Sequence, residues 1–241
     1  MSTIDLIRAQ MQSKPLAPAI RCGSLKWTYG DLEHEVVCLV ARLRELGLEP
    51  GDRVAIVGHR SERMIVAEIA SMWLGLPFVP VDRDQPSDRI HALLRGVRPS
   101  AIVDCDGDLE VEIEAPAVNL PQLPSAEGLG EPARIDGEHP VYLLYTSGTT
   151  GTPKAVVVPD RGLRNLVTGF LAPLFDENDV STVGVISPFF FDASMKMIHG
   201  ALGTGRCLSI ITTDERDDFG ELTRALHESR VDALDGTPTY L

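Results

Sequence analysis

The chain has 241 residues, of which 22 are Lys or Arg and 35 are Asp or Glu, so its formal net charge is −13. This length suits one large domain or two small ones, and it is long enough to bury a substantial core. So acidic a chain lacks the basic surface that nucleic acids and anionic membranes require, and we expect neither as a partner. A phosphate-bearing ligand would have to be held by local groups.

Apolar residues in the first half follow helical and strand spacing in turn. Leu32, Val36 and Leu39 fall on one face of a helix, and Thr28 and Asp31 are spaced as a capping box at its start. Apolar strands that alternate with helices predict βαβ units and a parallel sheet covered on both faces. The expected elements are a helix over Asp31–Leu46, a strand over Asp52–Gly58, a helix over Glu62–Leu74, a strand over Phe78–Val81, a helix beginning near Pro86 and a strand over Ala101–Val103.

Regular spacing fades between Asp104 and Pro140, a region we interpret as the connection between two α/β halves. Within it, Leu109–Glu114 alternates as an edge strand would. The sequence therefore predicts two subdomains, residues 1–140 with the connection and residues 141–241. The second is expected to hold a strand over Val141–Tyr145, a helix with Leu163, Leu166, Val167 and Phe170 on its apolar face, a strand over Thr182–Ser187, a helix over Ala193–Leu202, a strand over Cys207–Thr212, a helix over Asp218–Ser229 and a strand over Val231–Leu234.

Several motifs are excluded by their spacing. The four cysteines form no C-x-x-C pair, so we expect reduced thiols rather than a zinc or dithiol redox site. The run Asp104-x-Asp106-x-Asp108 lacks the glycine and the glutamate of a calcium loop, and no G-x-S-x-G elbow is present. The N-terminus lacks a signal-peptide pattern and no apolar run is long enough to span a membrane, so we expect a cytoplasmic protein.

One segment, TSGTTGTPK, carries a specific chemical signal. It follows the apolar run VYLLY directly, so it leaves the carboxyl end of a predicted strand, where open α/β sheets bind ligands. Its glycines let backbone N–H groups converge on an anion, its hydroxyls can donate to phosphate oxygens, and its lysine adds a positive charge. We interpret it as a polyphosphate-binding loop rather than a flexible polar turn. The residues concerned are Thr146, Ser147, Gly148, Thr149, Thr150, Gly151 and Lys154.

The run VYLLYTSGTTGTPKAVVV closely resembles the signature of the adenylate-forming (AMP-binding) enzymes, which include acyl-CoA synthetases, luciferases and the adenylation domains of nonribosomal peptide synthetases. Four further segments resemble those of the family in the same order, at residues 18–32, 77–90, 191–194 (FDAS) and 236–239 (GTPT). The resemblance covers almost the whole chain. It implies the N-terminal portion of the layered α/β fold of that family, with largely parallel, doubly wound sheets.

Enzymes of this family make a carboxylate attack the α-phosphate of ATP, which gives an acyl-adenylate and pyrophosphate. By resemblance, the loop grips the β- and γ-phosphates, and Thr146 and Lys154 act in catalysis. Magnesium (Mg2+) should accompany ATP because it neutralises the same oxygens, although the sequence does not indicate which residues would hold it.

The FDAS segment points to the substrate. In amino-acid-activating members of the family, the aspartate at the place of Asp192 pairs with the α-ammonium group of the substrate, whereas acyl-CoA synthetases generally lack it. The alternative is that Asp192 only caps the following helix. Phe191 is expected to shape the pocket wall. Lys196 stands where the family points a residue into the side-chain pocket and would favour an acidic side chain such as that of Glu, unless it lies on the solvated helix face.

Two positions depart from the usual family pattern. Ala155 follows the loop lysine where the family commonly has Gly, which matters only if that residue needs a positive φ or approaches the nucleotide closely. Asp160 stands where the family tends to have His. It would still make a good N-cap, but its charge would weaken ATP binding if it pointed inward.

The chain ends at Leu241, before the segments with which the family holds adenine and ribose and before its mobile C-terminal domain. We therefore expect a fragment, a truncated form or half of a split enzyme, inefficient in adenylation without the C-terminal half in cis or as a separate chain. The resemblance implies that the parent enzyme loads the aminoacyl group onto the phosphopantetheine thiol of a peptidyl carrier protein. A small helper protein is a further candidate partner.

The favoured function is therefore the N-terminal part of an amino-acid adenylation domain. Two alternatives stay open. A fragment of an acyl- or aryl-CoA ligase is the nearer one, and Asp192 argues against it. A noncatalytic nucleotide-binding or scaffold module is suggested by Ala155, Asp160 and the length of the chain. The sequence does not predict which amino acid is activated.

Overall fold

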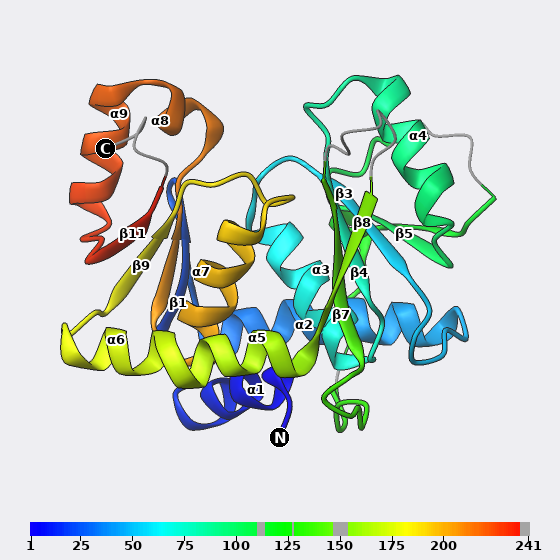
Figure 1. Ribbon diagram of the computed structural model, residues 1–241, viewed down its shortest axis with the longest axis horizontal. Helices are drawn as coiled ribbons and strands as arrows, with labels where there is room; N and C mark the ends of the chain where they lie inside the picture. The colour runs from blue at the N-terminus through cyan, green and yellow to red at the C-terminus, as the bar shows by residue number, and fades with distance from the viewer. Residues whose placement is uncertain (110–113, 127, 147–153, 237–241) are drawn as a thin grey trace. The chain divides into compact units, whose positions relative to one another are not determined.

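The structure is a computed structural model that describes residues 1–109, 114–126, 128–146 and 154–236. Its contacts divide the chain into two compact units, each built around one sheet (Figure 1). Unit 1 contains residues 1–33, 60–62 and 161–241, and unit 2 contains residues 34–59 and 63–160. The predicted boundary between 140 and 141 differs from this division. The strands within residues 18–28 join the sheet of unit 1, and the strands within residues 140–159 join the sheet of unit 2.

Unit 1 is built on the sheet β11-β9-β10-β1-β2. The strands β11, β9, β10 and β1 are parallel, whereas β1 and β2 form an antiparallel hairpin. The elements are α1 (Thr3–Ser13), β1 (Pro18–Cys22), β2 (Leu25–Thr28), the π-helical turn η2 (Val167–Leu171), α6 (Ala172–Glu177), β9 (Thr182–Val185), α7 (Asp192–Gly203), β10 (Cys207–Ile210), α8 (Thr213–Asp217), α9 (Phe219–Glu228) and β11 (Ala233–Asp235). Helix α5 (Asp160–Leu166) leads into η2.

Unit 2 is built on the sheet β6-β5-β3-β4-β7-β8. All of its strand pairs are parallel except β7 with β8. The elements are β3 (Val54–Gly58), α3 (Glu62–Trp73), β4 (Phe78–Asp82), α4 (Ser87–Val97), β5 (Ala101–Asp104), β6 (Ala117–Asn119), the 3-10 turn η1 (Leu120–Gln122), β7 (Pro140–Thr146) and β8 (Lys154–Pro159). Helix α2 (Tyr29–Glu45) begins in unit 1 and continues in unit 2.

The predicted α/β class with largely parallel sheets is confirmed, and so is the capping box that starts α2. The Thr28 N–H donates to Asp31 Oδ2 over 2.8 Å, and the Asp31 N–H donates to Thr28 Oγ1 over 3.2 Å. The sequence analysis missed α1, the β1–β2 hairpin, α8 and β8. For α1 the signal was available, because Ile4, Ile7 and Met11 are buried at helical spacing.

The predicted apolar face after β8 is wrong at Phe170, whose side chain is 56% exposed. The buried residues are instead Leu163, Val167, Leu171 and Phe175, each four positions after the last. An α-helix turns about 40° past a full circle in four residues, so this spacing drifts round a regular helix. The wider π turn η2 takes up the drift and keeps the four side chains in line.

One prediction for the edge of the unit 2 sheet lies mostly outside the described residues. The strand expected over residues 109–114 falls largely on residues 110–113, which lie outside the described part of the chain. In that part, β6 (Ala117–Asn119) forms this edge and pairs with β5 in parallel.

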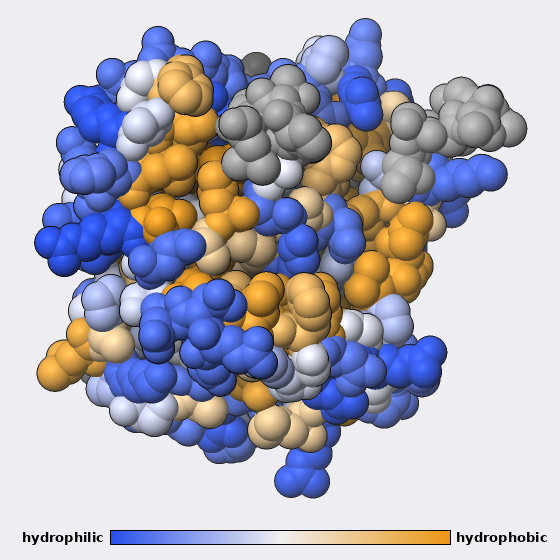
Figure 2. All heavy atoms as spheres, turned by 60° about the vertical axis from the view of Figure 1, so that its left-hand side comes forward, coloured by the Kyte–Doolittle hydropathy of each residue, from blue (hydrophilic) through white to orange (hydrophobic). Residues whose placement is uncertain are grey.

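The cysteines are free thiols, with three buried and Cys22 partly buried. Burial raises the pKa of the Cys22 thiol to about 12, so it stays protonated at neutral pH. No helix in the described ranges combines the length and apolar character needed to cross a membrane. On the face shown in Figure 2, polar side chains surround several separate apolar patches, as is ordinary for a protein surface.

His199 in α7 should make the stability of the protein depend on pH. The side chain is fully buried, and burial lowers the pKa of its imidazole from 6.5 to about 4. The unfolded chain therefore takes up this proton first as the pH falls. The stabilisation is complete above about pH 6.5 and decreases towards pH 4, by up to about 1.4 kcal/mol per pH unit.

Urea unfolding at several pH values between these limits measures the effect. The variant His199→Gln should show a smaller pH dependence than the unchanged chain, because its buried side chain takes up no proton. His227→Gln, at an exposed site in α9, is the control and should keep the original slope. Equal slopes in the His199→Gln variant and the unchanged chain would contradict the assignment.

Candidate functional site

The two ends of the expected phosphate loop lie opposite each other in unit 2. Thr146 is the last residue of β7 and Lys154 is the first of β8, and the two are register partners in the antiparallel pair. The loop residues Ser147, Gly148, Thr149, Thr150 and Gly151 lie outside the described residues. The fold thus brings Thr146 and Lys154 together.

This junction lies at the carboxyl edge of the parallel sheet. Strand β7 runs parallel to β4, with Tyr142 opposite Phe78, so Thr146 ends β7 at the edge where β3, β4 and β5 also end. Ligands of open α/β sheets bind at this edge. The Lys154 side chain is exposed.

The two departures from the family pattern are accommodated in the structure. Ala155 pairs with Tyr145 in regular β structure and has no positive φ, so a side chain at this position causes no backbone strain. Asp160 is the first residue of α5 rather than the N-cap that the sequence predicted. Its N–H donates to the His139 carbonyl over 2.9 Å, and only 1% of the residue is exposed. Its carboxylate is therefore buried instead of facing open solvent.

Charged side chains join the loops that follow β3, β4 and β5 at this same edge. The His59 ring lies between two carboxylates, with Nδ1 2.8 Å from Asp106 Oδ2 and Nε2 3.3 Å from Asp84 Oδ1. Arg83 Nη1 lies 2.9 Å from Asp108 Oδ1 and 3.4 Å from Asp104 Oδ1. Sequence reasoning missed this network, which connects the three loops that follow β3, β4 and β5 at the carboxyl edge of the sheet.

The run Asp104-x-Asp106-x-Asp108 forms a turn that is closed by backbone hydrogen bonds to Asp104. The Asp104 carboxylate accepts backbone N–H groups from Asp106, Gly107 and Leu109 over 2.8–3.1 Å. Its oxygens are thus already used within the turn. Across the described residues, no group of three or more His, Cys, Asp or Glu side chains is arranged to hold a metal ion.

The FDAS segment lies in unit 1, where it starts α7. Phe191, not Asp192, is the N-cap of this helix, so the alternative in which Asp192 serves as the cap is wrong. The Ser194 hydroxyl and N–H both donate to the Phe191 carbonyl, over 2.6 and 3.1 Å, and close the first turn. This leaves the Asp192 residue and the Phe191 ring exposed at the start of the helix.

Lys196 lies one turn further along α7 and forms an ion pair with Asp235. Its Nζ is 2.8 Å from Asp235 Oδ2, and the two side chains are 29% and 35% exposed. Because Lys196 is both paired and partly solvated, its role in the side-chain pocket and its place on a solvated helix face both stay predictions. Sequence reasoning missed Asp235, although its place at the end of a predicted strand was a usable signal. Asp192, Lys196 and Asp235 are thus grouped in unit 1.

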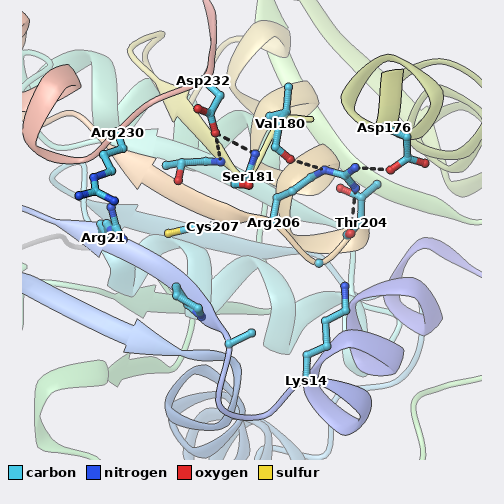
Figure 3. Close-up of a pocket in the computed structure, with 14 residues that line it drawn as sticks. Lys14, Arg21, Asp176, Val180, Ser181, Thr204, Arg206, Cys207, Arg230 and Asp232 are labelled. Atoms are coloured by element: carbon cyan, nitrogen blue, oxygen red, sulfur yellow. Dashed lines mark hydrogen bonds and ion pairs between the residues drawn. The ribbon is translucent and has the colours of Figure 1, made fainter. Parts of the chain in front are cut away.

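A cavity of about 680 Å³ opens elsewhere in unit 1 (Figure 3). Pro18, Thr182 and Cys207, which begin β1, β9 and β10, contribute to its lining. The cavity is therefore at the amino ends of the parallel strands, opposite the edge from which the chain continues to Asp192. It is rich in cationic side chains: Lys14, Arg21, Arg206 and Arg230.

Most of these cations have a structural explanation. Arg206 donates to the carbonyls of Val180 and Thr204 over 3.1 and 3.0 Å and forms an ion pair with Asp176. Thr204 is the C-cap of α7. A guanidinium in this position satisfies carbonyls at a helix end and opposes the partial negative charge there.

The same explanation covers two other cations of the cavity. Arg21 donates to the carbonyl of Ser229, the C-cap of α9, over 2.6 Å, and Lys14 is itself the C-cap of α1. Because helix C-termini gather at this edge, the positive charge balances helix dipoles. We do not assign a ligand to the cavity.

Comparison with known proteins gives consistent matches. Residues 7–241 match the family model described as AMP-binding enzyme. N-(5-amino-5-carboxypentanoyl)-L-cysteinyl-D-valine synthase of Amycolatopsis lactamdurans is 33% identical over 230 residues, covering 89% of this chain and 6% of that protein. Surfactin synthase subunit 1 of Bacillus subtilis is 28% identical over 234 residues, covering 93% of this chain and 6% of that protein.

Among solved structures, the N-terminal subdomain of Klebsiella oxytoca NpsA in complex with 3-hydroxybenzoyl-AMSN matches with a TM-score of 0.84 at 26% identity. The match covers 97% of this chain and 59% of that one. An artificially fused adenylation–PCP di-domain that contains NpsA matches with a TM-score of 0.85 at 26% identity, over 97% of this chain and 47% of that one. The chain thus spans only a small part of the two curated relatives.

Proposed function

Because the chain belongs to the AMP-binding enzyme family, we propose that it forms the N-terminal part of an amino-acid adenylation domain of a nonribosomal peptide synthetase. The reaction joins an amino acid to ATP and gives an aminoacyl-adenylate and pyrophosphate. The complete enzyme would then load the aminoacyl group onto the phosphopantetheine thiol of a peptidyl carrier protein. The observation that carries the amino-acid assignment is the exposed Asp192 at the start of α7.

In this proposal the Thr146–Lys154 junction holds the terminal phosphates of ATP. Hydroxyl and backbone N–H groups of the loop would donate to the phosphate oxygens, and Lys154 would neutralise charge on the departing pyrophosphate. This fits the exposed lysine at the carboxyl edge of the unit 2 sheet. A bound magnesium ion would supply further neutralisation of these oxygens. Because magnesium is commonly held by substrate phosphates, we propose that the ion arrives with ATP.

Asp192 would bind the α-ammonium group of the substrate. A carboxylate is negatively charged and accepts hydrogen bonds, so Asp192 is chemically suited to pair with a cation. The ammonium contact would fix one end of the amino acid and leave its carboxylate to attack the α-phosphate. An acyl or aryl acid has no amine to make this contact, and for this reason we favour amino-acid activation over a CoA ligase.

Lys196 and Asp235 would contact the substrate side chain. The pair is held at 2.8 Å but remains about one third exposed, so Lys196 retains N–H donors for a ligand. An acidic side chain such as that of Glu would satisfy them best. Asp235 would orient the ammonium group of Lys196. Its negative charge would also repel a substrate carboxylate that came too close to Asp235 itself. The aromatic ring of Phe191 would form part of the pocket wall.

ATP–pyrophosphate exchange with the longest natural protein that carries residues 1–241 tests the proposal. We expect exchange with amino acids, strongest with Glu or another acidic amino acid, and none with fatty or aryl acids. Exchange with fatty or aryl acids but not with amino acids would show that the chain belongs to a CoA ligase instead. If no carboxylic acid supports exchange, whether or not the protein binds ATP, the result would favour the noncatalytic module.

A further inference from the structure

Arg60 makes an unusual set of contacts for a residue in a short link. In the sequence it stands between β3 and α3, yet residues 60–62 belong to unit 1. Its Nε donates to the Ile211 carbonyl over 2.5 Å, and its two terminal nitrogens donate to the carbonyls of Ser187 and Val185. The guanidinium carbon lies 4.7 Å from the centre of the Phe189 ring.

These acceptors lie at the carboxyl ends of two neighbouring strands. Val185 is the last residue of β9, and Ile211 directly follows β10. The Val185 carbonyl also accepts the Ile211 N–H over 3.2 Å, so Arg60 adds a second donor there. The Ser187 and Ile211 carbonyls lie beyond the strand ends, and such carbonyls need other donors when they are shielded from water. A guanidinium is suited to this place because its N–H groups are fixed in one plane and it is always charged.

The carbonyls that Arg60 binds begin the connection that carries the proposed substrate residues. From Val185 the chain passes through Ser187 and Phe189 to Phe191 and Asp192 at the start of α7, without regular secondary structure. Arg60 holds the first part of this connection through two carbonyls and the middle through the Phe189 ring. The Ser194 contacts with the Phe191 carbonyl hold its far end.

The same strand end also supports the ion pair of the proposed side-chain pocket. Val185 is the register partner of Asp235 in β11, and Asp235 pairs with Lys196. Arg60 is therefore linked to the Lys196–Asp235 ion pair through Val185, whose carbonyl it binds and whose strand partner is Asp235. The described phosphate-loop residues, Thr146 and Lys154, belong to unit 2, whereas this strand end belongs to unit 1.

From this arrangement we infer that Arg60 is a positioning residue for the amino-acid site: it fixes the β9–α7 connection so that Asp192 and Phe191 are presented at the right place. This inference rests on the proposed function. It predicts that loss of the guanidinium fork weakens binding of the amino acid and leaves binding of ATP nearly unchanged. A lysine keeps the positive charge but not the planar set of donors, so Arg60→Lys should not restore the function.

Hydrogen exchange measured on this chain tests the structural half of the inference without any catalytic activity. In Arg60→Gln and in Arg60→Lys, amides between Ile186 and Asp192 should exchange at least tenfold faster than in the unchanged chain. Amides of the unit 2 strands should keep their rates. The control is Arg224→Gln, because Arg224 pairs with Glu221 on the exposed surface of α9. It should leave the Ile186–Asp192 rates unchanged.

ATP–pyrophosphate exchange in the longest natural protein that contains the chain tests the functional half. Both Arg60 variants should raise KM for the amino acid at least tenfold, with KM for ATP within twofold and Arg224→Gln unchanged. Unchanged amide exchange between Ile186 and Asp192, faster exchange throughout the chain, or equal rises in both KM values would each overturn the inference. If no amino acid supports turnover, the proposed function fails, and the local amide exchange alone decides for or against Arg60 as the anchor of this connection.

Discussion

Replacing Asp192 with asparagine is expected to raise KM for the amino acid about 100-fold in ATP–pyrophosphate exchange, with little change in KM for ATP. A hydrogen bond to a charged group is worth about 1.5–3 kcal/mol, which corresponds to roughly 10- to 150-fold in affinity. Asn keeps the size and one carbonyl acceptor but removes the negative charge. The upper part of that range is expected because the substrate ammonium would be left without a counter-charge.

Asp214→Asn is a matched control for this experiment. Asp214 is also an exposed acidic residue in the first turn of a helix of unit 1, so its replacement costs the same interaction with a helix dipole. It should leave both KM values unchanged. If Asp192→Asn behaved in the same way as Asp214→Asn, the ammonium contact would be refuted and with it the argument against a CoA ligase.

Replacing Lys154 with alanine is expected to weaken binding of Mg·ATP to this chain by about 10- to 100-fold. Lys154 is exposed at the start of β8 and opposite Thr146, where it can approach a phosphate at the carboxyl edge of the sheet. Loss of one charge-assisted contact accounts for an effect of this size. Isothermal titration of Mg·ATP into the unchanged chain and the variant measures the difference.

Lys26→Ala provides the control, because Lys26 is likewise an exposed lysine in a strand, here β2 of unit 1. It should bind Mg·ATP as the unchanged chain does. The Lys26→Ala and Lys154→Ala variants lose the same charge from the molecule as a whole, so a difference between them reports a local contact. Equal affinities in the Lys154→Ala and Lys26→Ala variants would show that Lys154 does not touch the nucleotide. Absence of binding by all three proteins would support a scaffold without a nucleotide site.

Periodicity predicted the buried elements of this fold well. Strands β3, β4, β5 and β7 are apolar on both faces, and their predicted positions agree with the structure to within two residues. The edge strand β8 was missed because its first four residues are exposed and show no alternation. In the helix after β8, Phe170 was predicted on the buried face, but Leu171 is buried instead. Periodicity assumes a constant number of residues per turn, and the π turn η2 departs from it.

Part of the candidate site could also be predicted from the sequence. TSGTTGTPK and FDAS are contiguous, so their residue types and order could be recognised directly. Lys196 with Asp235 and Arg60 with Val185 join positions far apart in the chain. Their contacts depend on strand order, and the order β11-β9-β10-β1-β2 does not follow from any local pattern.

The sequence by itself determined the α/β class and the family, and it supplied the residues proposed to contact phosphate and an amino acid, because these depend on local spacing and on short contiguous motifs. Only the tertiary structure decided that Phe191 rather than Asp192 caps α7, that Asp235 faces Lys196, and that Arg60 holds the end of β9. It also explained three of the cations around the cavity of unit 1, Lys14, Arg21 and Arg206, by their places at helix ends. The reason is that hydrogen bonds and ion pairs depend on distances of a few ångströms between atoms, which are set when the strands assemble into a sheet.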